Sequence, residues 1–189
     1  MKLIVKISPH YSSEKLENPT LDDLIDVFED RLYGWHLDWA DYLNKEEHAG
    51  FAVLQLSFSY FEAIAIYETG EGSDRRSKKY FQQSLIDVFP ELLKYEAKII
   101  EQIADLIYRD GRCGFYHAGM AKKSIILHEA KEPIGIDVNN DEVKNIRIDR
   151  LQFIESIKRH ASGYIYRLRD PQNIQARNNF TKGWNIFHQ

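Results

Sequence analysis

Arg112 and His117 stand near the middle of the chain with four residues between them, and glycines lie on both sides of the arginine. A permanently charged guanidinium and an imidazole that exchanges protons near neutral pH can together cleave a phosphodiester without a metal ion. This stretch is the one part of the sequence that suggests a chemistry. Arg112 and His117 are therefore the candidate catalytic residues.

The spacing of this pair does not by itself make a site. On an uninterrupted α-helix the two side chains would point about 140° apart, since each residue turns the chain by roughly 100°. Gly111 and Gly114 predict a break in the helix that would let the pair converge, and a symmetric dimer could instead supply one of the two groups. A structural interpretation remains open, in which the arginine stabilises a helix C-terminus and the histidine caps or packs.

Other chemistries have less support in the sequence. Cys113 and His117 could begin a zinc site or a thiol dyad, but Cys113 is the single cysteine and no third partner is identifiable. Glycine-rich phosphate loops and a serine nucleophile elbow are absent. We expect neither a metal nor a cofactor.

The composition favours one domain spanning residues 1–189. With 189 residues and 43% hydrophobic content, the chain can bury one core. A single cysteine excludes an internal disulfide and favours a reducing compartment, so we expect a cytoplasmic protein. No stretch approaches the roughly 20 apolar residues of a membrane span, and we expect no membrane partner.

The net charge of −4 conceals an asymmetry between the two parts of the chain. Residues 1–74 contain 5 basic and 15 acidic residues, whereas residues 75–189 contain 20 basic and 14 acidic residues. This polarity could serve a partner protein, nucleic acid or head-to-tail self-association, or it could reflect two ordinary solvated surfaces.

Apolar periodicity predicts a helical core over residues 20–110. Thr20 caps a long first helix near 21–46, with a kink possible at Gly34, and residues 49–67 form a buried central helix. Glu62 is expected at an edge of that helix, and the aromatic residues of these two helices are expected in the core: Trp35, Trp39, Tyr42, Phe58 and Tyr60. A third helix ends at Pro90, and a fourth runs from Glu91 to about Arg109, where Asp110 and Gly111 stop it.

Beyond the helical core, short β-like runs predict a hairpin or three-stranded ribbon over 124–148. Asp149 caps a final helix over 149–168, and residues 171–189 form a polar, basic tail. Residues 2–7 are an edge strand or an extended arm. The predicted fold class is mostly α, a bundle of four to five main helices with a small β-ribbon inserted before the last helix.

An Arg-x4-His motif at the end of a long helix in a helical bundle resembles the HEPN superfamily, the higher eukaryotes and prokaryotes nucleotide-binding domains. The string from Tyr108 to Gly119 looks like that family's motif region. The resemblance covers residues 20–170 in helix pattern. It implies a metal-independent endoribonuclease or an RNA-binding relative, usually a homodimer, in toxin–antitoxin or defence systems, with RNA and an antitoxin or other protein as partners.

The resemblance also implies roles for individual residues. His117 would handle the proton of the RNA 2′-hydroxyl, and Arg112 would stabilise the charge that develops on the phosphate. Arg109, Lys122 and Lys123 are our own candidates for binding the substrate, and Lys122 and Lys123 could instead be ordinary surface residues. The family's usual polar residue after the arginine is replaced here by Cys113. The alternative function is a non-catalytic dimerising module that binds another protein through its acidic N-terminal half.

Overall fold

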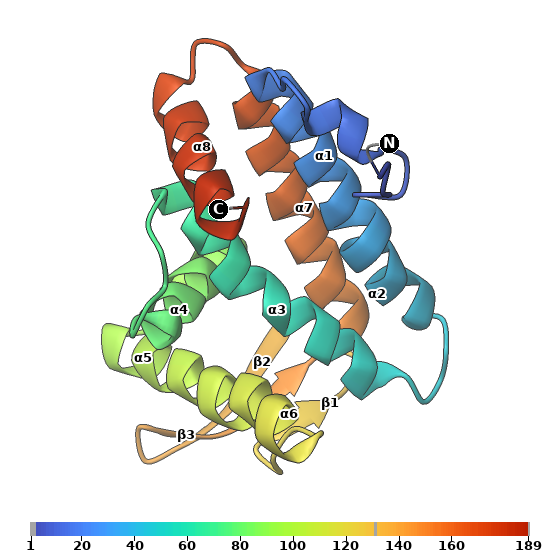
Figure 1. Cartoon of the computed structure of the whole chain (residues 1–189). Helices are drawn as coiled ribbons and strands as arrows, with labels where there is room; N and C mark the ends of the chain where they lie inside the picture. Colours follow the sequence, from blue (N-terminus) through green and yellow to red (C-terminus); the bar gives the residue numbers. More distant parts are fainter. Residues whose placement is uncertain (1–2, 131, 189) are drawn as a thin grey trace.

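Helices make up most of the structure, and a three-stranded sheet separates α6 from α7 (Figure 1). The computed structural model describes residues 3–130 and 132–188. The helices are α1 (Leu21–Leu32), α2 (Asp38–Leu43), α3 (Gly50–Thr69), α4 (Ser77–Val88), α5 (Ala97–Leu106), α6 (Cys113–Ala118), α7 (Arg150–Arg169) and α8 (Ile174–His188). The expected fold class, mostly helical with a small sheet, is confirmed at this level.

Helix α3 lies at the centre of the molecule, as the sequence predicts for residues 49–67. It contacts α2, α4, α7 and α8, and apolar residues cover most of its circumference. A helix that is apolar all round is stable in water only when other elements cover it. By length and composition α3 could also cross a membrane, but 61% of the apolar window is buried inside the protein, which fits a core helix.

The first predicted helix, 21–46, is present but contains a π-helical turn at Tyr33–Leu37 in place of a kink. Thr20 forms the expected N-terminal cap and exchanges hydrogen bonds with Asp23. A π-turn adds one residue to the helix and so turns the following residues by about 100°. Leu37 is buried as a result, whereas the tryptophans on this segment face solvent.

The prediction that all five aromatic residues lie in the core is therefore wrong for three of them. Trp35, Trp39 and Tyr42 are each at least half exposed, whereas Phe58 and Tyr60 on α3 are buried. The sequence pattern assumed a regular helix, and the π-turn changes which side of it meets the core.

The helix that contains the candidate site is longer than predicted. The segment Pro90–Lys94 is a 3₁₀-helix, α5 begins at Ala97, and the chain stays helical through a π-turn at Ile107–Arg112 and through α6. The predicted stop at Asp110 and Gly111 is wrong. A Cβ at Gly111 would lie 2.7 Å from a ring carbon of Phe58, so this glycine allows close packing on α3 and does not end the helix. Gly119, with φ of 72°, ends it.

The predicted ribbon over 124–148 is a three-stranded sheet with the order β1-β3-β2. Strand β1 (Ile125–Leu127) runs parallel to β3 (Glu142–Ile148), and β2 (Ile134–Asn139) runs antiparallel to it. Asn140 and Asp141 have positive φ angles of 51° and 58°, as a tight hairpin turn requires. Asp149 caps α7 as predicted, by accepting two backbone hydrogen bonds.

The predicted polar tail at 171–189 is instead helix α8, so the helix at 149–168 is not the last one. Phe180 and Trp184 are buried one turn apart, and α8 packs on α3 and α7. Gln189 lies outside the described residues. Two apolar residues at helical spacing anchor this segment, although its other residues are mostly polar.

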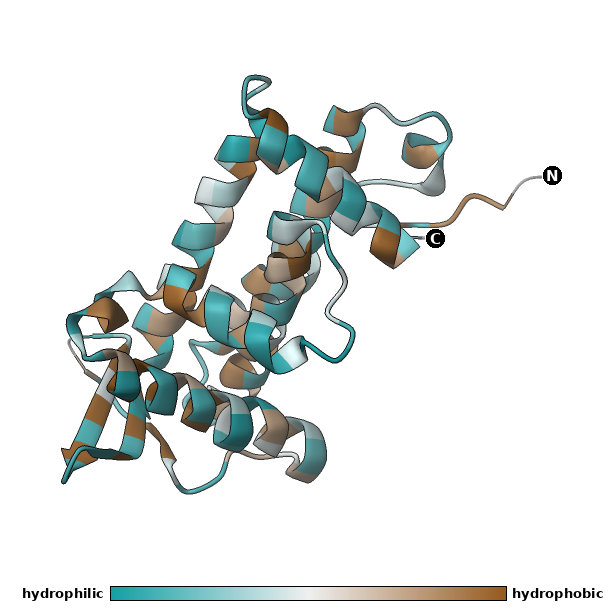
Figure 2. Cartoon of the chain, turned by 90° about the vertical axis from the view of Figure 1, so that its left-hand side faces the viewer, coloured by the Kyte–Doolittle hydropathy of each residue, from teal (hydrophilic) through white to brown (hydrophobic). Residues whose placement is uncertain are grey.

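The described part of the predicted N-terminal strand is an extended arm with one bridge, between Lys6 and Ser12. Lys2 lies outside the described residues. Leu3, Ile4 and Val5 are exposed, and Figure 2 shows this apolar segment extending away from the helices.

Much of the charge asymmetry is matched within the chain. Acidic side chains of residues 1–74 form ion pairs with basic side chains of residues 75–189, because α1, α2 and α3 pack against elements from the second part of the chain. The pairs are Asp22 with Arg177, Asp26 and Glu29 with Arg169, Asp41 with Lys158, Glu62 with Arg112, and Glu68 with Arg167. Each exposed pair adds little stability, about 0–1 kcal/mol, but the pairing gives the asymmetry an intramolecular explanation.

The packing of α8 on α3 can be tested at a glycine. A Cβ on Gly183 would lie 2.9 Å from the carbonyl oxygen of Ile66 and 2.9 Å from the Cα of Tyr67. We predict that Gly183→Ala pushes the helices apart and lowers the free energy of unfolding by about 1–3 kcal/mol.

Gly163→Ala in α7 is the matched control, since a Cβ there meets nothing nearer than the Arg167 guanidinium at 3.9 Å. The free energy of unfolding of this variant should rise by up to about 1 kcal/mol, because alanine has a higher helix propensity than glycine. Urea unfolding followed by tryptophan fluorescence measures both variants, and equal effects would argue against close packing of α8 on α3.

Candidate functional site

Arg112 lies on the wall of a surface pocket of about 420 Å³, at the last residue of the π-turn that precedes α6. One guanidinium nitrogen, Nη2, donates a hydrogen bond of 3.2 Å to Oε2 of Glu62 on α3. Among the described residues this is the one hydrogen bond of the Arg112 guanidinium. The remaining N–H groups stay available to a ligand, because a guanidinium carries five of them.

Two tyrosines one helical turn away hold the Arg112 guanidinium between them. Its central carbon lies 5.6 Å from the ring centre of Tyr108 and 5.4 Å from that of Tyr116. A cation over an aromatic ring gains about 0.5–1 kcal/mol at such a partly exposed place. The tyrosines therefore orient the cation without using its hydrogen-bond donors.

Glu62 is a residue of the pocket that the sequence did not single out for function. Its Oε1 accepts a hydrogen bond of 2.8 Å from Ser73, and its Oε2 faces Arg112. The two charged residues are 50 positions apart, so no local spacing could reveal the pair. The predicted place of Glu62 at a helix edge agrees with its partial exposure.

The rest of the pocket wall is mainly apolar and aromatic. Phe58, Phe115 and Tyr116 line it together with Phe187 from α8, so the segment expected to be a tail contributes to it. The volume falls within the range of small-molecule sites, which commonly combine apolar walls with a few polar groups.

The structure does not bring Arg112 and His117 together within one chain. Because the helix is continuous across Gly111 and Gly114, the two side chains leave it in directions about 140° apart. His117 is exposed, touches the ring of Tyr116 edge-on at 5.1 Å, and does not line the pocket. Of the two arrangements that would join the pair, the break in the helix is absent, and only a second copy of the chain remains.

Two of the three expected substrate-binding residues are engaged by Asp110. Arg109 donates two hydrogen bonds of 2.8 Å to the Asp110 carboxylate, and Lys122 lies 3.1 Å from it. Ser124 adds a hydrogen bond of 2.7 Å. Arg109 above all, with Ser124 and Lys122, holds the pKa of this carboxyl well below its usual range.

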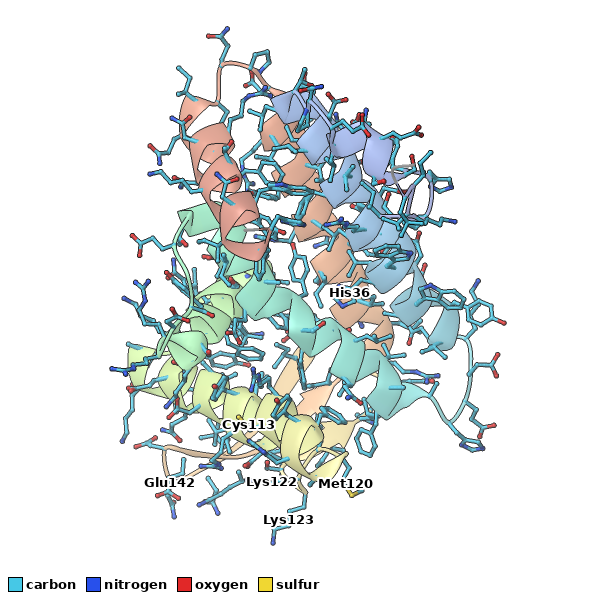
Figure 3. All side chains as sticks on the ribbon, in the orientation of Figure 1. His36, Cys113, Met120, Lys122, Lys123 and Glu142 are labelled. Carbon is cyan, nitrogen blue, oxygen red and sulfur yellow. The ribbon has the colours of Figure 1, made fainter. Side chains whose placement is uncertain are left out.

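This cluster has a structural role because it ties the end of the long helix to the loop before β1. The Asp110 carbonyl also accepts a hydrogen bond from the backbone of Lys122. Lys123 is exposed, and Figure 3 shows Lys122 and Lys123 below α6 at the lower edge of the molecule. Lys123 is thus the one of the three that keeps its charge unpaired among the described residues.

A second group of titratable residues connects α3 and α7. The hydroxyl of Tyr60 lies 2.8 Å from Nδ1 of His160, and Arg167 donates a hydrogen bond of 2.9 Å to Glu68. Burial raises the pKa of Glu68 to about 7 and lowers the pKa of His160 to about 4. These residues pair with each other, so we infer that the group has a structural role and connects α3 to α7.

No group of three or more His, Cys, Asp and Glu side chains within residues 3–130 and 132–188 is arranged to hold a metal ion. Cys113 is partly buried beside Arg112 and has no second cysteine to pair with.

Comparison of the chain with protein-family models, with curated proteins and with solved structures finds no match.

The Asp110 cluster predicts a stability effect with a defined pH dependence. Asp110→Asn should lower the free energy of unfolding near neutral pH by about 1–3 kcal/mol, because buried hydrogen bonds to a charged group are weakened. Since the folded-state pKa of Asp110 is depressed, its contribution is complete above the unfolded-state value near 4 and is lost as the pH falls below it.

The wild type should therefore lose more stability than Asp110→Asn between about pH 6 and pH 3, measured by urea unfolding. Asp137→Asn is the control, since Asp137 pairs with Arg147 at an exposed position on the sheet. Its effect should stay below about 1 kcal/mol. A parallel acid response of the wild type and Asp110→Asn would argue against a structural role for the Asp110 cluster.

Proposed function

We propose that the chain binds single-stranded RNA at the pocket beside Arg112, as a protein resembling the HEPN superfamily. The supporting observation is the position of Arg112 on the pocket wall, fixed by two tyrosines, with most of its hydrogen-bond donors free. A guanidinium matches the geometry of a phosphate, and exposed rings such as those of Tyr116 and Phe187 can stack on unpaired bases.

The charge distribution favours recognition of a short segment over binding along an extended backbone. Arg109, Lys122, Arg169 and Arg177 are all paired with acidic residues of the same chain. Proteins that track nucleic acid usually present a broad basic surface. We therefore expect binding to depend on the pocket and to have a shallow salt dependence.

Cleavage, the second part of the proposal, requires two copies of the chain. The 2′-hydroxyl oxygen would attack the adjacent phosphorus, His117 of one copy would accept the hydroxyl proton, and Arg112 of the other copy would stabilise the phosphate charge. The bond between phosphorus and the 5′-oxygen breaks, the protonated His117 returns the proton directly or through water to the leaving 5′-oxygen, and the products are a 2′,3′-cyclic phosphate and a 5′-hydroxyl. RNA supplies the nucleophile, so the step uses no metal-bound water. A toxin–antitoxin or defence setting follows from the family resemblance alone.

The alternative is a dimerising protein-interaction module without catalytic activity. It is favoured by one observation, the exposure of Trp35, Trp39 and Tyr42 along one stretch of α2 and the π-turn before it. Exposed aromatic residues are typical of contact surfaces. In this alternative RNA would not bind at Arg112.

RNA binding can be tested with variants that remove the same charge at two places. Arg112→Ala should weaken binding of a fluorescein-labelled RNA of mixed sequence by about tenfold or more, because the pocket loses its cation. Arg159→Ala is the control, an exposed arginine on α7 that lines a different pocket. Fluorescence anisotropy in EDTA measures both. Equal binding by the two variants would rule out the proposed site and leave the protein-interaction module.

If each site combines Arg112 of one copy with His117 of the other, two inactive variants should restore activity when they are mixed. Arg112→Ala and His117→Ala should each abolish cleavage. After the two proteins are mixed and allowed to exchange subunits, roughly a quarter of the wild-type activity should return, because half of the dimers are mixed and each contains one intact site. Activity is measured with labelled RNA in EDTA. If either variant alone cleaves like the wild type, or the exchanged mixture stays inactive, the two-copy mechanism is wrong.

A further inference from the structure

Glu62 places a carboxylate with spare acceptor capacity on the wall of the Arg112 pocket. A carboxylate offers about four lone-pair positions. Ser73 and Arg112 each occupy one of them, on different oxygens. One acceptor position on each oxygen therefore remains for a ligand.

The pocket around this carboxylate suits a flat ring. Its other walls are mainly apolar and aromatic, including Tyr116 and Phe187, with Gln55, Ser59 and Ser73 as further polar residues, and its volume of about 420 Å³ exceeds that of a nucleobase. A planar heterocycle could bury its faces against these side chains and present its edge to Glu62.

Among the four RNA bases, guanine offers this carboxylate the best partner. The Watson–Crick edge of guanine carries two neighbouring donors, the N1–H group and the 2-amino group, which match the two oxygens of a carboxylate. Adenine and cytosine have one amino donor next to an acceptor nitrogen, and uracil has one N–H donor between two acceptor oxygens. Adenine, cytosine and uracil therefore form one hydrogen bond fewer with the carboxylate, and their acceptor atom is repelled by the second carboxylate oxygen.

We propose that the pocket selects guanine in single-stranded RNA, with the Glu62 carboxylate accepting hydrogen bonds from N1–H and the 2-amino group. This inference rests on the proposed RNA binding and adds the identity of the base. Arg112 holds the Glu62 side chain in position through their ion pair and keeps its remaining donors for the neighbouring phosphate.

The test varies one base in an otherwise constant ligand. Fluorescein-labelled pentanucleotides of sequence UUNUU, with 2′-fluoro sugars that prevent cleavage, are titrated with the wild-type protein in EDTA. With guanine at N, binding should be about tenfold tighter than with adenine, cytosine or uracil, the usual discrimination of a two-bond contact to a base. Inosine lacks the 2-amino group and should fall between guanine and the other bases.

A substitution in the protein tests the same contact from the other side. Glu62→Gln keeps the size of the side chain but replaces one acceptor oxygen by a donor, so it should remove the preference for guanine over adenine. Glu155→Gln is the matched control, because Glu155 is exposed on α7 and lines a different pocket. This control should keep the full preference.

The outcomes separate this inference from the function on which it rests. If all pentanucleotides bind with the same affinity, or if the inosine ligand binds as tightly as the guanine ligand, RNA binding stands but the guanine contact to Glu62 is wrong. If none of them binds, and the RNA of mixed sequence does not bind either, both proposals are overturned. A guanine preference that survives in Glu62→Gln would place the selectivity on another residue and would also overturn the inference.

Discussion

The burial of α3 is the constraint on which the rest of the structure depends. A 20-residue helix with apolar residues on most of its surface needs cover from other elements, and α2, α4, α7 and α8 provide most of it. This packing decides where polar residues of α3 can reach the surface. Glu62 does so at the pocket, next to the turn that carries Arg112. The candidate site is thus a place where the cover of the central helix is incomplete.

Two π-turns then determine which residues of their helices face solvent or the pocket. One turn, at Tyr33–Leu37, directs Trp35 and Trp39 to solvent, and the other, at Ile107–Arg112, delivers Arg112 to the pocket while the helix continues. Because that helix is continuous, the side chains of Arg112 and His117 point in different directions. The same feature that orients the arginine between Tyr108 and Tyr116 therefore makes a second copy necessary for any chemistry that uses both groups.

Local signals in the sequence predicted local structure well. Thr20 and Asp149 cap their helices, the apolar run at 49–67 forms α3, and the region 124–148 forms the sheet. The π-turns were not predictable because an inserted residue leaves no compositional mark, and α8 was missed because few apolar residues anchor it. Residue type and spacing mark Arg112 as a candidate site residue. They do not mark its partner Glu62, since that contact depends on how α3 packs against a helix 50 residues away.

Whether the pocket of Arg112 and Glu62 receives RNA can be read from a residue-by-residue map of the surface that the ligand contacts. Titration of the isotope-labelled protein with a short guanine-containing RNA, followed by nuclear magnetic resonance, gives such a map. RNA in the pocket should shift the amide signals of Ser59, Glu62 and Ala63 of α3 and of Phe115 and Tyr116 of α6 more than those of other residues. Shifts confined to the exposed aromatic residues of α2, with the pocket unchanged, would contradict RNA binding at this pocket.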